Sequence, residues 1–150
     1  MAAFLPKTTG SVPRFRRGDL VEVASGEEGF VGSYYEATVV EEQPGGDYVV
    51  QYKTLFRNDF SGPLMEVAPA AEIRPRPPKV VAAAFRPKDV VDAFDNDGWW
   101  VGKITGRVGN KYYVYFESTG DEIAYPKNRV RVHQELVFGP NRKWVCVSSL

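Results

Sequence analysis

The sequence contains few of the residues on which catalysis, metal binding and disulfide formation depend. Its 150 residues include one cysteine, Cys146, and one histidine, His133, so an internal disulfide is excluded and no pair of ligands has the spacing of a metal site. No glycine-rich phosphate loop occurs, and a serine nucleophile would have only one imidazole as its base. We expect His133 to be a satisfied surface or core residue and Cys146 a small apolar one. The sequence therefore predicts neither an enzyme nor a cofactor.

Long apolar segments are absent as well. No run is long enough to cross a membrane, and the start, MAAFLPKTTGSVPRF, lacks the basic residues and apolar stretch of a secretory signal. With 43% hydrophobic and 25% charged residues, the composition is that of a globular chain. The single cysteine favours a reducing compartment, the cytosol or the nucleus.

The net charge of zero conceals an uneven distribution along the chain. Between Asp19 and Ile73, eleven acidic residues face only two basic ones, which gives this span a net charge of about −9 (2 − 11). Between Phe85 and Glu135, eight basic and eight acidic residues cancel. The first half is therefore expected to attract cationic partners and to repel phosphate.

The sequence repeats itself in four blocks that follow one another in the same order, which indicates a duplication. FRRGDLVEV at 15–23 matches FRPKDVVDA at 85–93, and GSYYEATVV at 32–40 matches GWWVGKITG at 98–106. DYVVQYKTL at 47–55 then matches KYYVYFEST at 111–119, and AAEIRPRP at 70–77 matches KNRVRVHQ at 127–134.

Each repeat is predicted to consist of short strands. Tyr35, Ala37 and Val39 alternate with more polar neighbours and should share one face of a strand. PGGD, NDG and GNK are turn signals between strands, and helical periodicity is absent nearly everywhere. Several short strands at close spacing suggest a small, strongly bent β-barrel in each half, so the expected fold class is all-β.

The prolines of RPRPPKVVAAAF, between the repeats, favour an extended, stiff connection. Because a unit of roughly sixty residues buries only a modest core, we expect the two units to pack together. The predicted organisation is a flexible N-terminus, a first domain, a linker, a second domain and a tail, at 1–13, 14–78, 79–84, 85–145 and 146–150.

The pair of units resembles the tandem Agenet domain, a plant-expanded branch of the Royal superfamily, which includes Tudor and chromo domains. The resemblance rests on FRRGDLVEV, GFVGSYYEATV, YVVQYKTL and AAEIRPRPP in the first unit, and on GWWVGKI and RVRVHQEL in the second. It implies a Tudor-like, five-stranded bent barrel in each unit and a binding role without catalysis. Members of the family read methylated lysine on the histone H3 tail. A plant subgroup similar to this arrangement reads lysine-nine methylation in silenced heterochromatin, which implies a nuclear protein.

The resemblance also implies an aromatic cage. A methylated ammonium is held best by the faces of electron-rich rings through cation–π attraction. In the family the cage draws on the loop before the second strand, the start of that strand, and the third strand with its following loop. Those places hold Phe30, Tyr34 and Tyr35, Tyr52 and Phe56. Tyr34 and Tyr35 face opposite ways, so only one of them is expected to line the cage.

Acidic side chains near the cage could contact the peptide. Asp59 is the candidate carboxylate beside the cage, and Glu27 and Glu28 could meet basic residues of the tail. Each candidate has a plain alternative: a core ring for Tyr35 and Tyr52, a loop contact for Phe30 and Phe56, and a solvated face for the glutamates.

The second unit offers weaker candidates: Phe94, Trp100 and Phe116, with Asp95 and Asp121. Ser118 and Thr119 stand where a further ring would close a cage, so this unit is expected to support the first. Two other functions stay open. One is a nucleic-acid module using KNRVRVH and RPRPPK, which the charge of the first half disfavours. The other is an adaptor that binds a non-histone partner through strand edges. The fragment is expected to be monomeric, or part of a longer array.

Overall fold

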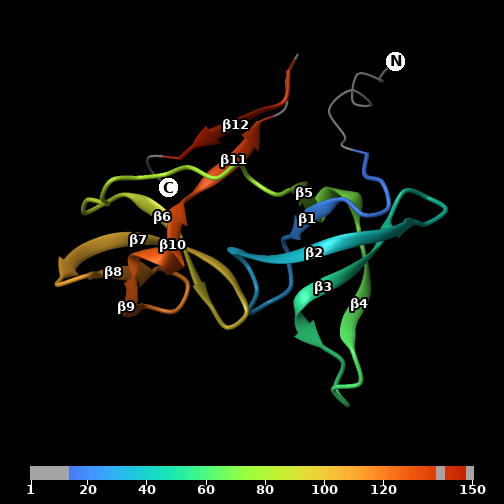
Figure 1. The fold of residues 1–150 in the computed structure, drawn as a ribbon, viewed down its shortest axis with the longest axis horizontal. Helices are drawn as coiled ribbons and strands as arrows, with labels where there is room; N and C mark the ends of the chain where they lie inside the picture. The colour runs from blue at the N-terminus through green and yellow to red at the C-terminus, as the bar shows by residue number, and fades with distance from the viewer. Residues whose placement is uncertain (1–13, 138–140, 148–150) are drawn as a thin grey trace. The chain divides into compact units, whose positions relative to one another are not determined.

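The computed structural model describes residues 14–137 and 141–147, and the regular structure in these ranges consists of β-strands and two single-turn 3-10 segments (Figure 1). The prediction of an all-β chain is confirmed. Within the described ranges, no helix is long and apolar enough to cross a membrane.

The described residues divide into two compact units. The first unit is built on the described chain up to Arg76, and Val137 and residues 141–143 belong with it. The second is built on the chain from Pro77 to Leu136, together with the segment that begins at Trp144. The predicted linker, 79–84, thus lies in the stretch that clusters with the second unit.

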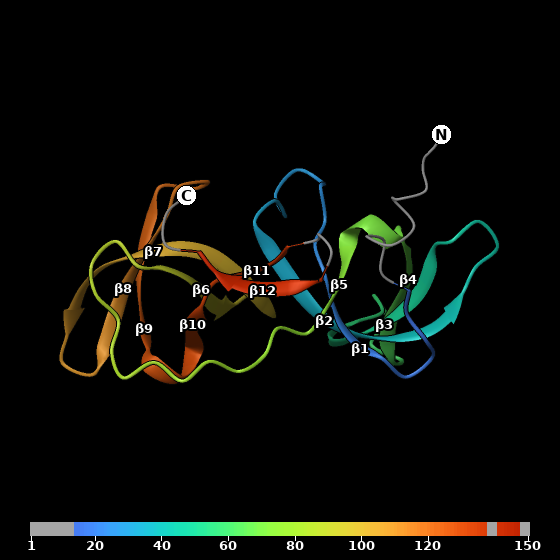
Figure 2. The same cartoon turned by 90° about the horizontal axis from the view of Figure 1, so that it is seen from above.

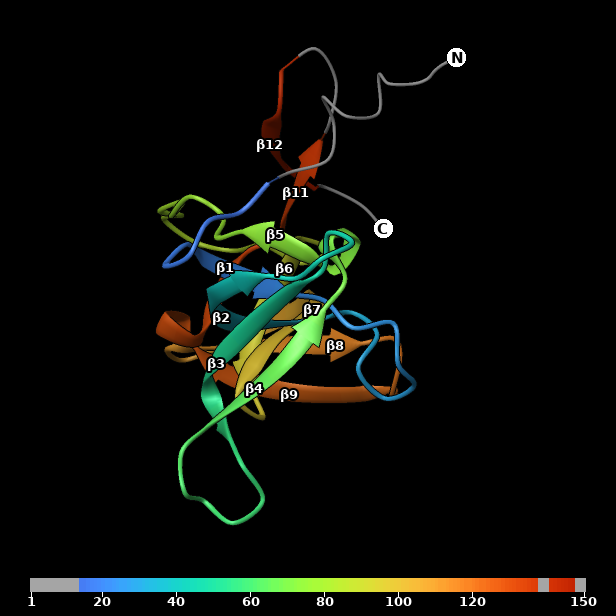
Figure 3. The same ribbon diagram turned by 90° about the vertical axis from the view of Figure 1, so that its right-hand side faces the viewer.

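The first unit is a bent antiparallel sheet with the strand order β5-β1-β2-β3-β4. Figure 3 shows β3 and β4 running side by side to the loop at their tip, and Figure 2 shows the turn η1 between β4 and β5. In the residue pairs described, β4 and β5 form the two edges, so the sheet is open rather than closed into a barrel. The elements are β1 (Leu20–Val23), β2 (Ser33–Glu42), β3 (Tyr48–Phe56), β4 (Pro63–Ala68), η1 (Ala70–Glu72) and β5 (Ile73–Pro75).

The second unit has the same order with its own strands, β10-β6-β7-β8-β9. Its elements are β6 (Val90–Asp95), β7 (Gly98–Val108), β8 (Lys111–Phe116), β9 (Asp121–Pro126), η2 (Lys127–Arg129) and β10 (Val130–Val132). After it, β11 (Gln134–Val137) and β12 (Lys143–Cys146) pair with each other in a separate two-stranded sheet.

The alternation read from the sequence decides which face of β2 is buried. Tyr35, Ala37 and Val39 are all buried, as predicted, and their neighbours are partly exposed. The pairing of β2 with β3 shifts between Val39 and Glu41. Such a bulge bends a strand and increases its twist, and β7 has a matching shift between Ile104 and Gly106.

The same anchor opens both units, which supports the duplication. The backbone N–H of Phe15 donates to the Tyr48 hydroxyl at 3.1 Å, and their ring centroids lie 5.4 Å apart, edge to face. Phe85 and Tyr112 repeat the arrangement, with a hydrogen bond of 3.4 Å and ring centroids 5.3 Å apart. Each pair joins the segment before the first strand to the core of its own unit.

The turn before the first strand requires left-handed backbone in both units. Gly18 has φ +91°, and its N–H donates to the Val39 carbonyl at 2.8 Å. Lys88 adopts φ +80° at the equivalent place and donates to the Ile104 carbonyl at 2.8 Å. A lysine is strained in this region, where glycine is not.

Candidate functional site

Three of the predicted cage residues lie together in the first unit. The Phe30 ring is 6.2 Å from the Tyr35 ring, and the Tyr35 ring is 6.5 Å from the Tyr52 ring, both edge to face. We call Phe30, Tyr35 and Tyr52 the ring cluster. Phe30 is held on its loop because Ser33 donates to its carbonyl through both the backbone N–H, at 3.1 Å, and the side-chain hydroxyl, at 2.5 Å.

Tyr34 lies on the other side of β2 and has a different neighbour. The Arg74 guanidinium sits over the Tyr34 ring, 3.6 Å from its centroid. Arg74 also donates to the fully buried Glu22 carboxylate at 2.8 Å. Of the two adjacent tyrosines, Tyr35 therefore belongs to the ring cluster, and Tyr34 packs beneath an arginine that pairs with the core.

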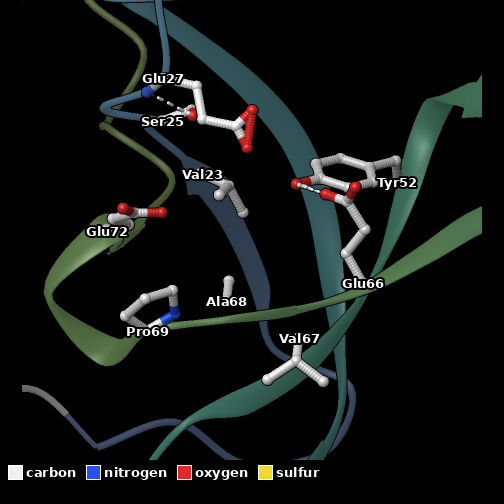
Figure 4. A pocket seen from close by; sticks show the side chains of 9 residues that line it. All are labelled: Val23, Ser25, Glu27, Tyr52, Glu66, Val67, Ala68, Pro69 and Glu72. Carbon is white, nitrogen blue, oxygen red and sulfur yellow. Dashed lines mark hydrogen bonds between the residues drawn. The ribbon is translucent and has the colours of Figure 1, made fainter.

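A cavity of about 400 Å³ opens beside Tyr52 (Figure 4). We call it the acidic cavity. Figure 4 shows the carboxylates of Glu27 and Glu72 pointing toward its middle and that of Glu66 beside the Tyr52 hydroxyl. Its lining comes from β1, β3, β4 and the segments that flank them: Val23, Ser25, Glu27, Tyr52, Glu66, Val67, Ala68, Pro69 and Glu72.

Negative charge dominates this cavity. The Tyr52 hydroxyl donates to Glu66 Oε1 at 3.0 Å. Burial raises the pKa of Tyr52 well above its usual range, and the hydrogen bond to Glu66 and the charges of Glu72 and Glu27 add to the effect. Tyr52 therefore stays neutral, and the three glutamates leave the cavity suited to a cationic group. No cluster of side chains able to hold a metal ion occurs in the part of the chain that the structure describes.

The other predicted contacts of the first unit are placed differently. Phe56 ends β3 and is 54% exposed, and Asp59 lies in the loop beyond it. Hydrogen bonds from the Ser61 side chain and backbone lower the pKa of Asp59, which is fully exposed. Glu27 lines the acidic cavity, whereas its neighbour Glu28 is exposed and is not among the lining residues. That Phe56 lines a cage and that Asp59 contacts the peptide beside it both stay predictions.

One residue explains why the cavity occurs in the first unit. The strand pairings place Ala68, opposite Tyr48, at the position that Tyr125 holds opposite Tyr112 in the second unit. The Tyr125 ring packs edge to face on Phe116 at 6.1 Å, and its hydroxyl donates to Asp95 Oδ2 at 2.6 Å. Tyr125 thus fills the space that Ala68 leaves open.

The second unit's candidates have structural roles. Trp100 packs against the core and donates its indole N–H to the Asp95 carbonyl at 2.8 Å. Phe116 is buried, and the Phe94 ring packs edge to face against Trp99, with 5.1 Å between the ring centroids. Asp121 is exposed at the start of β9. These contacts hold most of the candidate side chains within their own unit, and the expectation that this unit supports the first stays a prediction.

The two residues set aside as non-catalytic differ in burial. His133 is 1% exposed and lies within hydrogen-bond distance of both Asp92 Oδ1, at 2.7 Å, and Glu135 Oε2, at 3.1 Å. Burial opposes its charged form, but the hydrogen bonds and charges of Asp92 and Glu135 outweigh it and raise the pKa of His133. Cys146, the last residue of β12, is exposed.

Sequence reasoning missed Glu66, Glu72 and Ala68. A signal was present, because extending the last repeat match backwards aligns MEVAPAAEIRP at 65–75 with EIAYPKNRVRV at 122–132. That alignment places Ala68 against Tyr125, Glu66 against Ile123 and Glu72 against Arg129. The first unit thus has carboxylates where the second has an apolar and a basic residue, and a small residue where the second has a large one.

Two bent antiparallel sheets, one of them with an acidic cavity beside clustered rings, define the chain as a Tudor-like binding module rather than an enzyme. The Agenet domain family model matches residues 18–78. The crystal structure of Arabidopsis thaliana AGDP1 AGD34 is similar, with a TM-score of 0.82 and 34% identity, covering 89% of this chain and 90% of that one. The crystal structure of ADCP1 tandem Agenet domain 3-4 is similar with a TM-score of 0.73 and 31% identity, and the match covers 81% of this chain and 82% of that one.

The chain belongs to the Agenet domain family, and its relatives of known structure include tandem Agenet domains. Among curated proteins it is 35% identical over 136 residues to Protein AGENET DOMAIN (AGD)-CONTAINING P1 of Arabidopsis thaliana. That match covers 89% of this chain and 26% of the relative. The chain therefore spans about a quarter of the length of this relative, and less of the DUF724 domain-containing protein 6 that it also matches.

Proposed function

We propose that the chain is a chromatin reader whose first unit binds a methylated lysine of the histone H3 tail, with lysine nine as the expected residue. The observation that carries the proposal is the acidic cavity, where three carboxylates and Tyr52 surround a volume that Tyr125 fills in the second unit. Family membership supports a binding role, and a histone partner would place the protein in the nucleus, at silenced chromatin.

The cavity and the ring cluster share Tyr52, which links the two parts of the proposed site. A methylated ammonium keeps its positive charge but is large and weakly hydrated, so it gains from both ring faces and carboxylates. Each well-placed ring contributes on the order of 0.5–2 kcal/mol. In this proposal Phe30, which is 43% exposed, covers the ligand from its loop, and Phe56, Asp59 and Glu28 contact the peptide outside the cavity.

The carboxylates favour the lower methylation states. A mono- or dimethylated ammonium still has an N–H to donate, whereas a trimethylated one has none. A charge-assisted hydrogen bond is worth about 1.5–3 kcal/mol when its partners are desolvated. Glu27 and Glu72 point toward the middle of the cavity and are the expected acceptors (Figure 4).

Isothermal titration with histone H3 tail peptides carrying zero to three methyl groups on lysine nine tests the proposal. We expect the methylated peptides to bind more tightly than the unmethylated one, with the dimethylated form at least as tight as the trimethylated form. Glu27→Gln should weaken binding, and Glu41→Gln is its control, since it removes one charge from the exposed end of β2, outside the cavity. Equal binding of all four peptides would rule out methylation reading by this cavity.

A further inference from the structure

A second cavity of the first unit has the opposite charge. It has a volume of about 300 Å³ and is lined by Arg14, Phe15, Arg16, Asp19, Leu20, Pro75 and Arg142. We call it the arginine cavity. Its lining includes three arginines and one aspartate, so it is cationic in composition although the unit's sequence from Asp19 to Ile73 is strongly acidic.

The acidic neighbours of this cavity are partly engaged elsewhere. Asp19 Oδ2 accepts the backbone N–H of Arg16 at 2.8 Å, which closes the turn before β1. Arg14 pairs with Glu42 at 3.4 Å, but the two side chains are 81% and 40% exposed, and such surface pairs contribute little and exchange readily. An incoming anion could therefore recruit Arg14 together with Arg16 and Arg142.

We infer that the arginine cavity binds a phosphomonoester, carried by a phosphorylated serine or threonine of a peptide. A phosphorylated side chain carries a charge of about −1.5 to −2 at neutral pH, and arginine forks bind its oxygens in pairs. Recognition of such a group by an arginine cluster is a known mode of peptide binding. The cavity is compact, whereas nucleic-acid binding draws on phosphate contacts repeated along a surface.

Charge elsewhere in the first unit also favours a peptide over a nucleic acid. β1 begins at Leu20, in the arginine cavity, and ends at Val23, in the acidic cavity. Since a strand rises about 3.3 Å per residue, Leu20 and Val23 lie roughly 10 Å apart along β1. A nucleic acid would meet repulsion at the acidic end, but a peptide with a cationic lysine and a phosphorylated residue could satisfy both ends.

Only the choice of a peptide as carrier rests on the proposed function; the phosphate site does not. The first test therefore uses O-phospho-L-serine as the probe, followed on the arginine side-chain NMR signals of the whole chain. We expect saturable shifts at Arg14, Arg16 and Arg142, and no shifts with L-serine. Arg142→Ala should weaken phosphoserine binding about tenfold, as expected for one charge-assisted contact.

Arg86→Ala is the matched control, because Arg86 is the second unit's counterpart of Arg16 and makes the same turn with Asp89, at 2.9 Å. This variant should bind phosphoserine as the unchanged chain does. Absence of saturable shifts, or an equal loss in Arg86→Ala, would overturn the site. Tighter binding of a short DNA duplex that displaces phosphoserine, with a steep salt dependence, would overturn the peptide assignment.

A final arm uses H3-tail peptides that carry a methylated lysine alone, a phosphoserine alone, or both marks separated by roughly three to five residues. The doubly marked peptide should bind most tightly, and Arg142→Ala should remove only the gain due to phosphate. If the methyl group contributes nothing but phosphoserine still binds, the proposed function fails and the phosphate site stands. If phosphate contributes nothing in any peptide, the peptide assignment fails.

Discussion

Replacing Ala68 by tyrosine would give the first unit the side chain that the second unit holds at position 125. The Tyr125 ring lies 6.1 Å from Phe116, and Tyr52 occupies the position of Phe116 in the first unit. The new ring is therefore expected to lie against Tyr52 and to occupy the acidic cavity. Its hydroxyl would point toward Ser25, the counterpart of Asp95, so the variant should fold.

The expected loss of peptide affinity follows from the contacts that the new ring replaces. Covering the Tyr52 face removes about 0.5–2 kcal/mol of cation–π attraction. Excluding the ligand from one carboxylate removes about 1.5–3 kcal/mol more. The two lower limits add to about 2 kcal/mol, which corresponds to roughly a 30-fold loss of affinity.

Isothermal titration with the dimethylated lysine-nine peptide, alongside thermal unfolding, measures this loss. Met65→Tyr is the control, since Met65 lies on the same strand, is 39% exposed and does not line the cavity. It should leave peptide binding unchanged. If Ala68→Tyr is folded and binds within about threefold of the unchanged chain, the ligand does not enter the acidic cavity and the argument is refuted.

Three further changes test the physical account of the fold. Lys88→Gly should raise the free energy of unfolding by about 0.5–1 kcal/mol in a urea titration, because it relieves left-handed strain that Gly18 avoids; a loss of stability would contradict this. Arg74→Leu should lower the unfolding free energy by about 3 kcal/mol, because it removes the guanidinium that pairs with the fully buried Glu22 carboxylate. A change below about 1 kcal/mol would count against the importance of that pair. The raised pKa of His133 stabilises the fold fully below pH about 6.5, and this contribution should fade as the pH rises through the folded-state pKa; His133→Gln should flatten the profile.

Local alternation in the sequence was sufficient to predict the sheets. The buried face of β2, at Tyr35, Ala37 and Val39, follows from a period of two, and the turn signals locate the hairpins. The strands extend past the stretch of clear alternation, with β2 reaching Glu42 and β3 reaching Phe56, because hairpin pairing continues there. Alternation does not show whether a sheet closes into a barrel: in the residue pairs described, β4 and β5 stay the two edges of the first sheet, although only Pro69 and η1 separate them in the chain.

The site was less predictable because its residues come together through distant strand pairing. The sequence could show that Tyr34 and Tyr35 face opposite ways, but the choice between them depends on Arg74, which β5 brings over Tyr34. Glu66 lies outside the motifs that carry the family resemblance, and Glu72 lies within AAEIRPRPP, which is not one of the places from which the family draws its cage. The importance of Ala68 follows only from comparison with Tyr125, because a cavity forms where a side chain is small relative to the space around it.

The exchange of Ala68 for Tyr125 has an evolutionary consequence. After a domain is duplicated, the two copies can diverge: a small residue in one copy opens a cavity, while a large residue in the other keeps the same position packed. The size of the side chain at the last apolar position of the fourth strand then determines whether the unit has a cavity. Comparing the residue at this position across tandem Agenet domains should separate units with a cavity from units in which a large side chain fills it.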